Sequence, residues 1–275
     1  MDFKKLLIRS VSGLAYIAII VFCILYNRIS FLALTSFLSI IATFEFLKIN
    51  SEISNKNILE NTITLLASLC LSLSCLIYPL VCWIFIILAR MIIQLYKKDS
   101  NPIKELGIFF ISQMLIALPL GLMGFIGDLW SQHILLAIFI FIWINDTGAY
   151  IVGCSIGRHR LFERISPKKS WEGFFGGFIF TIIASIVFCL TCAKFFSLQP
   201  NIYLWISLGA LTSIFGTWGD LAESMVKRTL NIKDSGNIIP GHGGILDRID
   251  SLLFVLPIIF IFLMANELFL FTNFM

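Results

Sequence analysis

The chain has 275 residues, of which 59% are hydrophobic and only 13% are charged. An ordinary soluble domain carries roughly 25% charged residues, and a soluble globule of this size cannot cover so much apolar side chain with polar surface. The composition therefore excludes a soluble enzyme, a nucleic-acid-binding module and a disordered chain, and it predicts a membrane protein. The formal net charge of +4, from 20 basic and 16 acidic residues, indicates no polyanionic partner such as nucleic acid.

Nine apolar stretches are long enough to cross a bilayer, which takes about 20 residues. They lie near residues 11–27, 29–47, 61–79, 80–96, 106–126, 134–153, 173–195, 202–219 and 251–271. Only Tyr78-Pro79 separates the third stretch from the fourth, and proline favours a break there. We predict an all-α fold, a polytopic bundle with about nine transmembrane helices, and counts of eight or ten stay open.

The basic residues are divided unequally between the predicted loops. With the N-terminus inside, 17 lysines and arginines lie on the inner side, whereas only Arg28 and Lys194 lie outside. By the positive-inside rule, this asymmetry predicts a multi-pass protein of the cell inner (cytoplasmic) membrane with its N-terminus in the cytoplasm.

The two halves of the chain differ in their polar residues. Residues 1–130 have short loops and little chemistry, and we expect these helices to bind lipid or to form a dimer interface. Residues 131–275 contain two polar, glycine-rich loops, 154–172 and 220–250. We predict that this half is the catalytic region and that both loops face the cytoplasm.

The first polar cluster, Asn145 to Tyr150, lies inside an otherwise apolar helix. A carboxylate such as Asp146 costs about 2.5–3.5 kcal/mol to insert into a membrane, so we expect it to face a wet cavity, a cation or an ionic partner. A buried hydrogen bond to a neighbouring helix is the alternative. For Asn145 and Tyr150 the two interpretations stay equally open.

The second cluster is the basic loop that contains Arg158, Lys168 and Lys169. Arginine and lysine beside a helix start suit phosphate groups, and Ser170 is placed to cap the helix that follows. Inner loops are basic for topological reasons alone and attract anionic lipid head groups. A substrate site and a purely topological role therefore both stay open for this loop.

The third cluster follows the eighth apolar stretch. Helical spacing places Asp220, Glu223, Ser224 and Lys227 on one face, and Asp247, Asp250 and Ser251 share a face at the start of the ninth stretch. Carboxylate oxygens at adjacent helix ends suit Mg²⁺, which also binds substrate phosphates, and histidine is too sparse to favour zinc. Together with Asp146, these aspartates predict a magnesium–polyphosphate site. The alternative is a solvated loop with salt bridges, for example between Asp220 and Lys227.

The third cluster is part of a long motif, which reads Ser224-x-Val226-Lys227-Arg228-x4-Lys233-Asp234-x-Gly236-x2-Ile239-Pro240-x-His242-Gly243-Gly244-Ile245-x-Asp247-Arg248-Ile249-Asp250. This motif resembles the signature of the phosphatidate cytidylyltransferase, or CDP-diacylglycerol synthase, family. Segments 145–150 and 166–173 are similar to the same family, so the resemblance covers about residues 140–252.

This resemblance implies Mg²⁺-dependent transfer of CMP from CTP to phosphatidic acid, giving CDP-diacylglycerol and pyrophosphate in phospholipid biosynthesis. It also implies a homodimer in the membrane lipid and potassium as a candidate second cation. The residues expected to act in catalysis are Asp220, Asp247, Lys227, Arg228, His242 and Asp250, with Asp146, Asp220 and Asp247 as metal ligands. Those expected to bind substrate are Asn145, Tyr150, Arg158, Ser166, Lys168, Lys169, Glu172, Ser224, Lys233, Asp234, Gly243, Gly244 and Arg248.

Two other functions stay open. A CTP-dependent polyprenol or dolichol kinase would also handle CTP in a membrane, but it would transfer the γ-phosphoryl group to an alcohol. An ion-coupled transporter would place polar residues near the midplane and on both sides. The outer segments 127–133 and 196–201 carry almost no chemistry, which favours an enzyme working from the cytoplasm.

Overall fold

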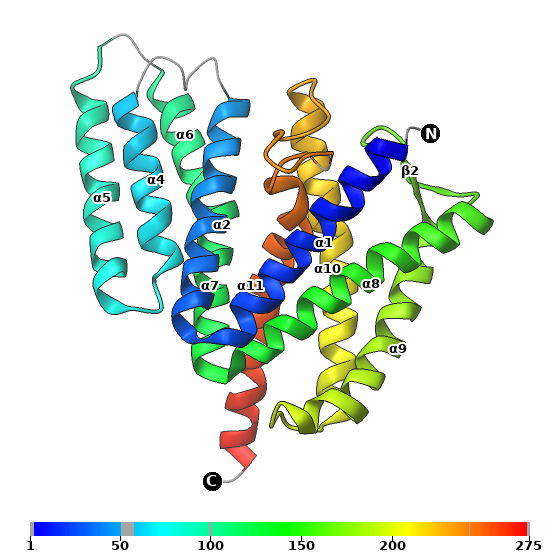
Figure 1. Cartoon of the computed structure of the whole chain (residues 1–275). Helices are drawn as coiled ribbons and strands as arrows, with labels where there is room; N and C mark the ends of the chain where they lie inside the picture. The colour runs from blue at the N-terminus through cyan, green and yellow to red at the C-terminus, as the bar shows by residue number, and fades with distance from the viewer. Residues whose placement is uncertain (1–2, 51–57, 99–100, 242, 274–275) are drawn as a thin grey trace. The chain divides into compact units, whose positions relative to one another are not determined.

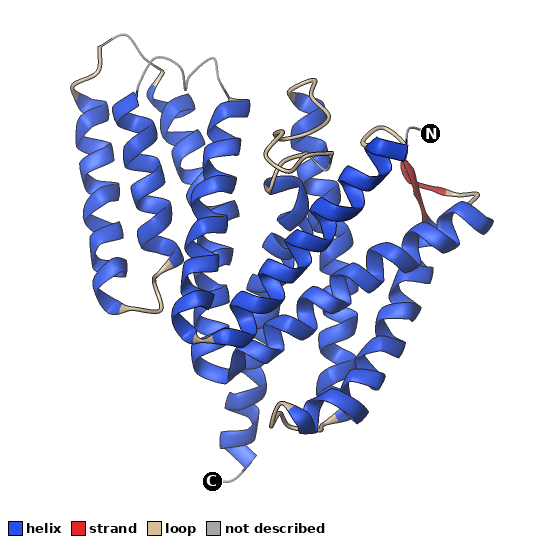
Figure 2. Ribbon diagram, in the orientation of Figure 1, coloured by secondary structure: helices blue, strands red, loops and turns tan. Residues whose placement is uncertain are grey.

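The computed structural model describes residues 3–50, 58–98, 101–241 and 243–273, and nearly all of them are helical (Figures 1 and 2). The helices are α1 (Phe3–Tyr26), α2 (Arg28–Ile49), α4 (Ile58–Ser72), α5 (Ile77–Leu95), α6 (Pro102–Ser112), α7 (Leu118–Ile126), α8 (Gln132–Ile156), α9 (Trp171–Phe195), α10 (Ile202–Thr229) and α11 (Leu246–Asn273). Two π-helical turns, Gln113–Ala117 and Gly127–Ser131, join α6 to α7 and α7 to α8. The only strands in the described ranges are β1 (Arg160–Phe162) and β2 (Ser166–Ser170).

The lengths and hydropathy of these helices are those of a multi-pass membrane protein. Within the described residues, six helical stretches are long and apolar enough to cross a membrane, and Ser10–Tyr26 and Ile58–Ser72 are shorter apolar helices. Each predicted apolar stretch falls largely in a helix, which confirms the helical membrane bundle. The count of about nine is not confirmed. The fifth and sixth predicted spans lie within one helical stretch, Pro102–Ile156, and the first and third fall in the two shorter helices.

The break before α5 does not lie where the sequence predicted it. The turn spans residues 73–76, and Tyr78-Pro79 lies inside the first turn of α5. Proline is tolerated there because the first N–H groups of a helix have no partner within the helix.

The chain divides into two compact units. The first comprises Met1–Leu129 and Asp234–Ile249, and the second comprises Trp130–Lys233 and Asp250–Met275. The loop that the sequence analysis placed with the C-terminal half is thus shared, since residues 234–249 group with the N-terminal helices.

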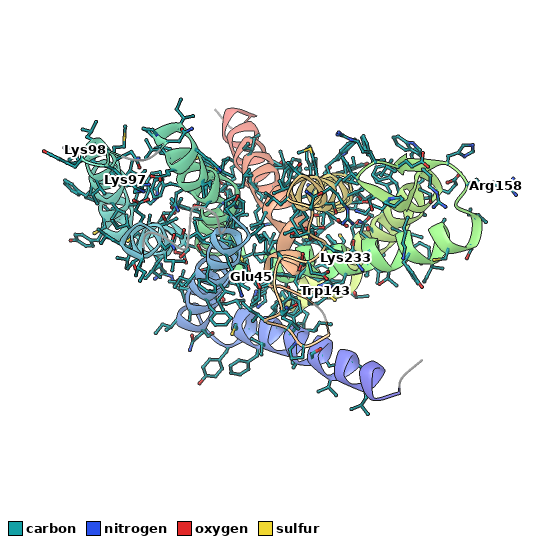
Figure 3. All side chains as sticks on the ribbon, turned by 90° about the horizontal axis from the view of Figure 1, so that it is seen from above. Glu45, Lys97, Lys98, Trp143, Arg158 and Lys233 are labelled. Carbon is teal, nitrogen blue, oxygen red and sulfur yellow. The ribbon has the colours of Figure 1, made fainter. Side chains whose placement is uncertain are left out.

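In the first unit, α2 packs against α4 and α7, and α4 packs against α5 (Figure 1). A buried charge network joins the ends of α4, α5 and α6. The Arg90 guanidinium donates to Glu60 at 2.9 Å and to Gln94 at 2.7 Å, and Lys97 donates to both Glu60 and Glu105 at 2.8 Å. Burial disfavours the charge on Lys97, but the hydrogen bonds to Glu105 and Glu60 outweigh it and raise the pKa of Lys97. Figure 3 labels Lys97 beside the exposed Lys98.

In the second unit, α9 packs against α8 and α10. Glycines allow the close approach of α8 and α9: a Cβ atom at Gly177 would lie 2.7 Å from the carbonyl oxygen of Asn145, and one at Gly173 would lie 2.8 Å from that of Ala149. Small residues at helix contacts are typical of membrane bundles. This contact fixes the polar segment of α8 against the start of α9.

The strands β1 and β2 form an antiparallel hairpin inside the predicted loop 154–172, with Arg160 opposite Ser170 and Phe162 opposite Ser166. Ser170 ends β2 and caps α9 by accepting the Gly173 N–H at 3.1 Å, as its sequence position predicts. The hairpin therefore leads directly into a helix whose position is set by packing on α8.

Candidate functional site

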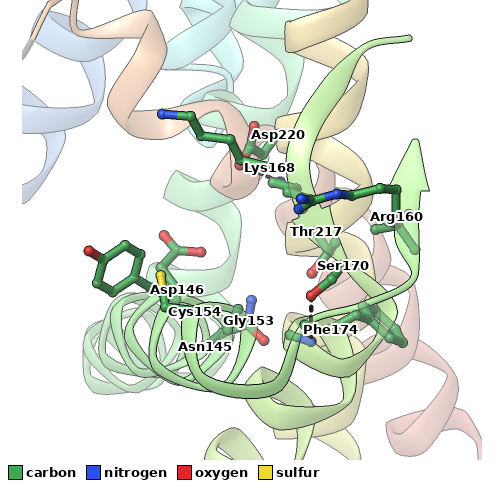
Figure 4. A pocket seen from close by; sticks show the side chains of 16 residues that line it. Asn145, Asp146, Gly153, Cys154, Arg160, Lys168, Ser170, Phe174, Thr217 and Asp220 are labelled. Carbon is green, nitrogen blue, oxygen red and sulfur yellow. Dashed lines mark hydrogen bonds and ion pairs between the residues drawn. The ribbon is translucent and has the colours of Figure 1, made fainter. Parts of the chain in front are cut away.

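A cavity of about 530 Å³ lies in the second unit, between α8, the hairpin, the start of α9 and α10 (Figure 4). It combines acidic, basic and aromatic side chains. The lining residues are Asn145, Asp146, Ala149, Tyr150, Gly153, Cys154, Gly157, Arg160, Leu161, Lys168, Lys169, Ser170, Gly173, Phe174, Thr217 and Asp220. Six of the predicted site residues are thus brought together: Asn145, Asp146, Tyr150, Lys168, Lys169 and Asp220.

Two aspartates face this cavity from different helices. Asp146 is exposed on α8, and Asp220 is half-buried on α10 (Figure 4). Asp220 Oδ2 lies 2.5 Å from Lys169 Nζ, and its Oδ1 accepts the Ser224 hydroxyl at 3.2 Å. The sequence suggested Lys227 as an alternative ion-pair partner of Asp220. In the structure Asp220 pairs with Lys169, and Lys227 pairs with Glu223 one turn away on α10.

A third aspartate of this unit, Asp250 on α11, adds negative charge near the first two. It experiences electrostatic repulsion from Asp220, Glu223 and Asp146. The close approach of α11 to α10 depends on Gly219, where a Cβ atom would lie 2.7 Å from the carbonyl oxygen of Asp250. Asp250 therefore interacts electrostatically with three other carboxylates of this unit.

The hairpin supplies the basic side of the cavity through Arg160, Lys168 and Lys169. Glu172 holds the base of the hairpin: its carboxylate lies 2.6 Å from the His159 ring and accepts the backbone N–H groups of Arg158 and His159 at 3.1–3.2 Å. Glu172, predicted to bind substrate, thus orders the basic segment, and Arg158 itself is exposed outside the cavity lining.

Other predicted residues of this unit make contacts within the protein. The Arg228 guanidinium donates to the carbonyl oxygens of Ile165 at 3.4 Å and Ile232 at 3.2 Å. Asn145 is 3% exposed and accepts the Ser213 hydroxyl at 2.6 Å, so the alternative of a buried interhelical hydrogen bond is realised at this residue. Ser166 belongs to β2, and Lys233 is exposed after α10; neither lines the cavity.

The remaining predicted residues belong to the first unit. The Asp247 carboxylate accepts the Ser235 N–H at 2.9 Å and the Gly244 N–H at 2.8 Å, which closes residues 234–247 into a compact loop. Gly243 has φ +90, a backbone conformation that favours glycine. Asp234 and Arg248 are exposed on either side of this loop. His242 lies outside the described residues. The roles predicted for these residues stay predictions.

The donor set of the cavity suits a hard cation only in part. Within the described residues, no three His, Cys, Asp or Glu side chains are grouped to hold a metal ion. Mg²⁺, however, commonly binds one or two carboxylates and completes its six ligands with water and substrate phosphates. Asp146 and Asp220 line one cavity and fit such a partial set.

Arg160 and Thr217 are two polar lining residues that the sequence analysis did not select as site residues. Arg160 lines the cavity, but in the sequence it counted only as one of the basic residues of an inner loop. Thr217 lines the same cavity one turn before Asp220, and this spacing on a polar helix face was an available signal.

The comparisons with known proteins point to one family. The chain is 49% identical over 135 residues to a phosphatidate cytidylyltransferase of Staphylococcus epidermidis. The aligned residues are 49% of this chain and 50% of that protein. It is 43% identical over 134 residues to that of Staphylococcus aureus, with 49% and 50% covered. In these comparisons the chain spans about half the length of the relatives that it matches. The model of the cytidylyltransferase family matches residues 7–265. The chain belongs to the cytidylyltransferase family.

Proposed function

We propose that this protein is a phosphatidate cytidylyltransferase that transfers CMP from CTP to phosphatidic acid and releases pyrophosphate. The observation that carries the proposal is the cavity in which Arg160, Lys168 and Lys169 face Asp146 and Asp220. Three cations suit the phosphates of a nucleotide and of an anionic lipid, and the two aspartates suit a cation bound with them. The family and the names of the similar proteins support the same reaction.

The reaction forms one phosphorus–oxygen bond and breaks another. A phosphate oxygen of phosphatidate attacks the α-phosphorus of CTP, and the bond to the β-phosphate breaks, so that pyrophosphate leaves with the electron pair. The second pKa of a phosphate monoester is about 6, so the attacking oxygen is ionised at neutral pH and needs no strong general base. The protein therefore contributes mainly position and charge.

Lysine and arginine side chains supply that charge. Lys168, Lys169 and Arg160 would neutralise the phosphates of both substrates and hold them in line. Asp146 and Asp220 would hold Mg²⁺, which supplies charge neutralisation at the phosphate oxygens when bound. Potassium as a second cation remains a prediction.

The assay that tests the proposal follows the label of CTP. Detergent-purified protein is incubated with Mg²⁺, phosphatidate and CTP labelled at the α- or the γ-phosphate. We expect α-label in CDP-diacylglycerol and γ-label in pyrophosphate. Transfer of γ-label to an added polyprenol would instead indicate a kinase. No transfer to either lipid, with ion flux in proteoliposomes, would indicate a transporter.

The proposal includes an orientation in the cell inner membrane, with the cavity open to the cytoplasm. It is supported by the excess of basic residues in the predicted inner loops. Cys154 is exposed and lines the cavity, so it reports the side directly when it is the only cysteine kept. A membrane-impermeant maleimide should label it in inside-out vesicles and not in right-side-out vesicles.

A homodimer is also part of the proposal, on the resemblance to the family alone. Light scattering of the purified protein, corrected for bound detergent, measures the protein mass per particle. Twice the chain mass of 31.1 kDa is the expected result, and a single chain mass would contradict it.

A further inference from the structure

Glu45 is a buried carboxylate in the last turns of the apolar helix α2. Its residue exposure is 2%, and it lies within the first unit, beside the loop of residues 234–249 (Figure 3). A buried carboxylate without partners is costly, so the contacts that hold it indicate its role.

Glu45 contacts the loop of residues 234–249 near each end of the loop. Its Oε2 accepts the Leu246 N–H at 2.8 Å and the Ser235 hydroxyl at 3.4 Å. Leu246 is the first residue of α11, where backbone N–H groups lack partners within the helix and a negative charge is favourable. Glu45, which lies on α2, therefore provides a hydrogen-bond acceptor for the first N–H group of α11.

The glycines of the loop match this contact. A Cβ atom at Gly244 would lie 2.6 Å from Glu45 Oε2, and one at Gly236 would overlap Glu45 Oε1. Side chains at these two positions would push the carboxylate away. The space that Glu45 occupies thus depends on glycine at two positions of the C-terminal motif.

The contacts continue to Asp247. Ser235, whose hydroxyl binds Glu45, donates its backbone N–H to the Asp247 carboxylate at 2.9 Å. Gly244, which lies against Glu45, donates its own N–H to the same carboxylate at 2.8 Å. Movement of Glu45 would disturb both residues that hold Asp247.

We propose that Glu45 is a positioning residue, which holds the loop of residues 234–249 and thereby sets the orientation of the Asp247 carboxylate. The effect on catalysis rests on the proposed function, because it requires the predicted role of Asp247. The N-terminal half, expected from its sequence to carry little chemistry, then contributes directly to the order of the motif loop.

Hydrogen–deuterium exchange of the full chain in detergent tests the positioning without any assay of activity. In Glu45→Ala, the amides of Ser235, Gly244 and Leu246 should exchange at least about tenfold faster. The Leu246 N–H loses its acceptor, and the Ser235 and Gly244 N–H groups lose the order that holds them on the Asp247 carboxylate. Glu45→Gln keeps a side-chain oxygen that accepts the Leu246 N–H, so it should exchange within about threefold of the parent protein.

Glu105→Ala is the matched control. It removes another mostly buried carboxylate of the same unit, which pairs with Lys97. Its exchange should increase around α6 and not in residues 234–249. Unchanged exchange of these residues in Glu45→Ala, or an equal increase in Glu105→Ala, would overturn the proposal.

Kinetics separate this proposal from the proposed function. With CTP and phosphatidate, Glu45→Ala should lower kcat by about tenfold with the KM for CTP nearly unchanged, and Glu45→Gln should restore most of kcat. If the parent protein transfers no CMP, the proposed function fails while the exchange result still decides the role of Glu45. If exchange rises but kcat does not fall, the link from Glu45 to catalysis is wrong.

Discussion

Lys169 Nζ on β2 lies 2.5 Å from Asp220 Oδ2 on α10, so one ion pair joins the basic hairpin to the acidic end of the helix. Both residues line the same cavity. In the free protein the two charges balance each other. Under the proposed function, a substrate phosphate would compete for Lys169, and the cation that accompanies it would compete for Asp220.

Loss of the Asp220 charge should abolish turnover. Asp220→Asn keeps the size of the side chain but cannot neutralise a cation, so we expect CMP transfer to fall by more than about 100-fold. The α-label assay measures the rate, and gel filtration in detergent checks that the variant folds. Retention of more than about a tenth of the activity would contradict a direct role at the metal.

Loss of the Lys169 charge should weaken nucleotide binding more than it slows chemistry. In Lys169→Met, we expect the KM for CTP to rise by about tenfold, because one charge-assisted contact to phosphate is lost. Lys98→Met is the control, since Lys98 is exposed and lies outside the cavity. An equal KM in both variants would argue against phosphate binding by Lys169.

Glu172 should act on the rate through the hairpin. Glu172→Gln weakens the contact to the His159 ring and the hydrogen bonds that order residues 158–159. We expect kcat/KM to fall by about three- to tenfold and amide exchange of residues 158–162 to rise. Glu163→Gln makes the same change at an exposed position of the hairpin turn and should leave both quantities near the parent values. Similar losses in the two variants would mean that net charge alone matters.

The buried network of the first unit should contribute to stability rather than to chemistry. Arg90 is 2% exposed, and Arg90→Met leaves Glu60 with Lys97 as its remaining ion-pair partner among the described residues. We expect the free energy of unfolding to drop by about 3 kcal/mol, because a mostly buried carboxylate loses one of its two ion-pair partners. Thermal unfolding in detergent measures the change.

The matched comparison is Arg28→Met, which removes an ion pair to Asp128 from an arginine that is 53% exposed. Solvent screens this pair, so the loss should be clearly smaller than in Arg90→Met. A larger loss from Arg28→Met than from Arg90→Met would contradict the role assigned to burial.

Hydropathy was sufficient to predict where the helices lie. Backbone polar groups in a bilayer must pair within the protein, and a helix pairs them within a single segment, so a long continuous apolar stretch predicts a helix. The break between α4 and α5 was misplaced for a local reason. Pro79 is compatible with the first turn of a helix, so proline alone did not locate the turn.

Much of the candidate site was also predictable. Charged residues are rare in so apolar a chain, so Asp146, Lys168, Lys169 and Asp220 stood out, and they line one cavity. Glu45 did not stand out in this way. It lies in an apolar stretch with no motif around it, and its partners Ser235 and Leu246 are 190 and 201 residues away in the sequence.

The amino-acid sequence by itself determined the helical membrane class, the polar segments and their periodicity, because these follow from local transfer free energy and helix geometry. Only the tertiary structure decided the partners. Asp220 and Lys227 are two turns apart on one helix, yet Asp220 pairs with Lys169 of the hairpin. Lys227 forms its ion pair with Glu223 instead. Such choices depend on how closely the chain approaches itself, at Gly177 between α8 and α9 and at Gly219 between α10 and α11, and no local pattern encodes that distance.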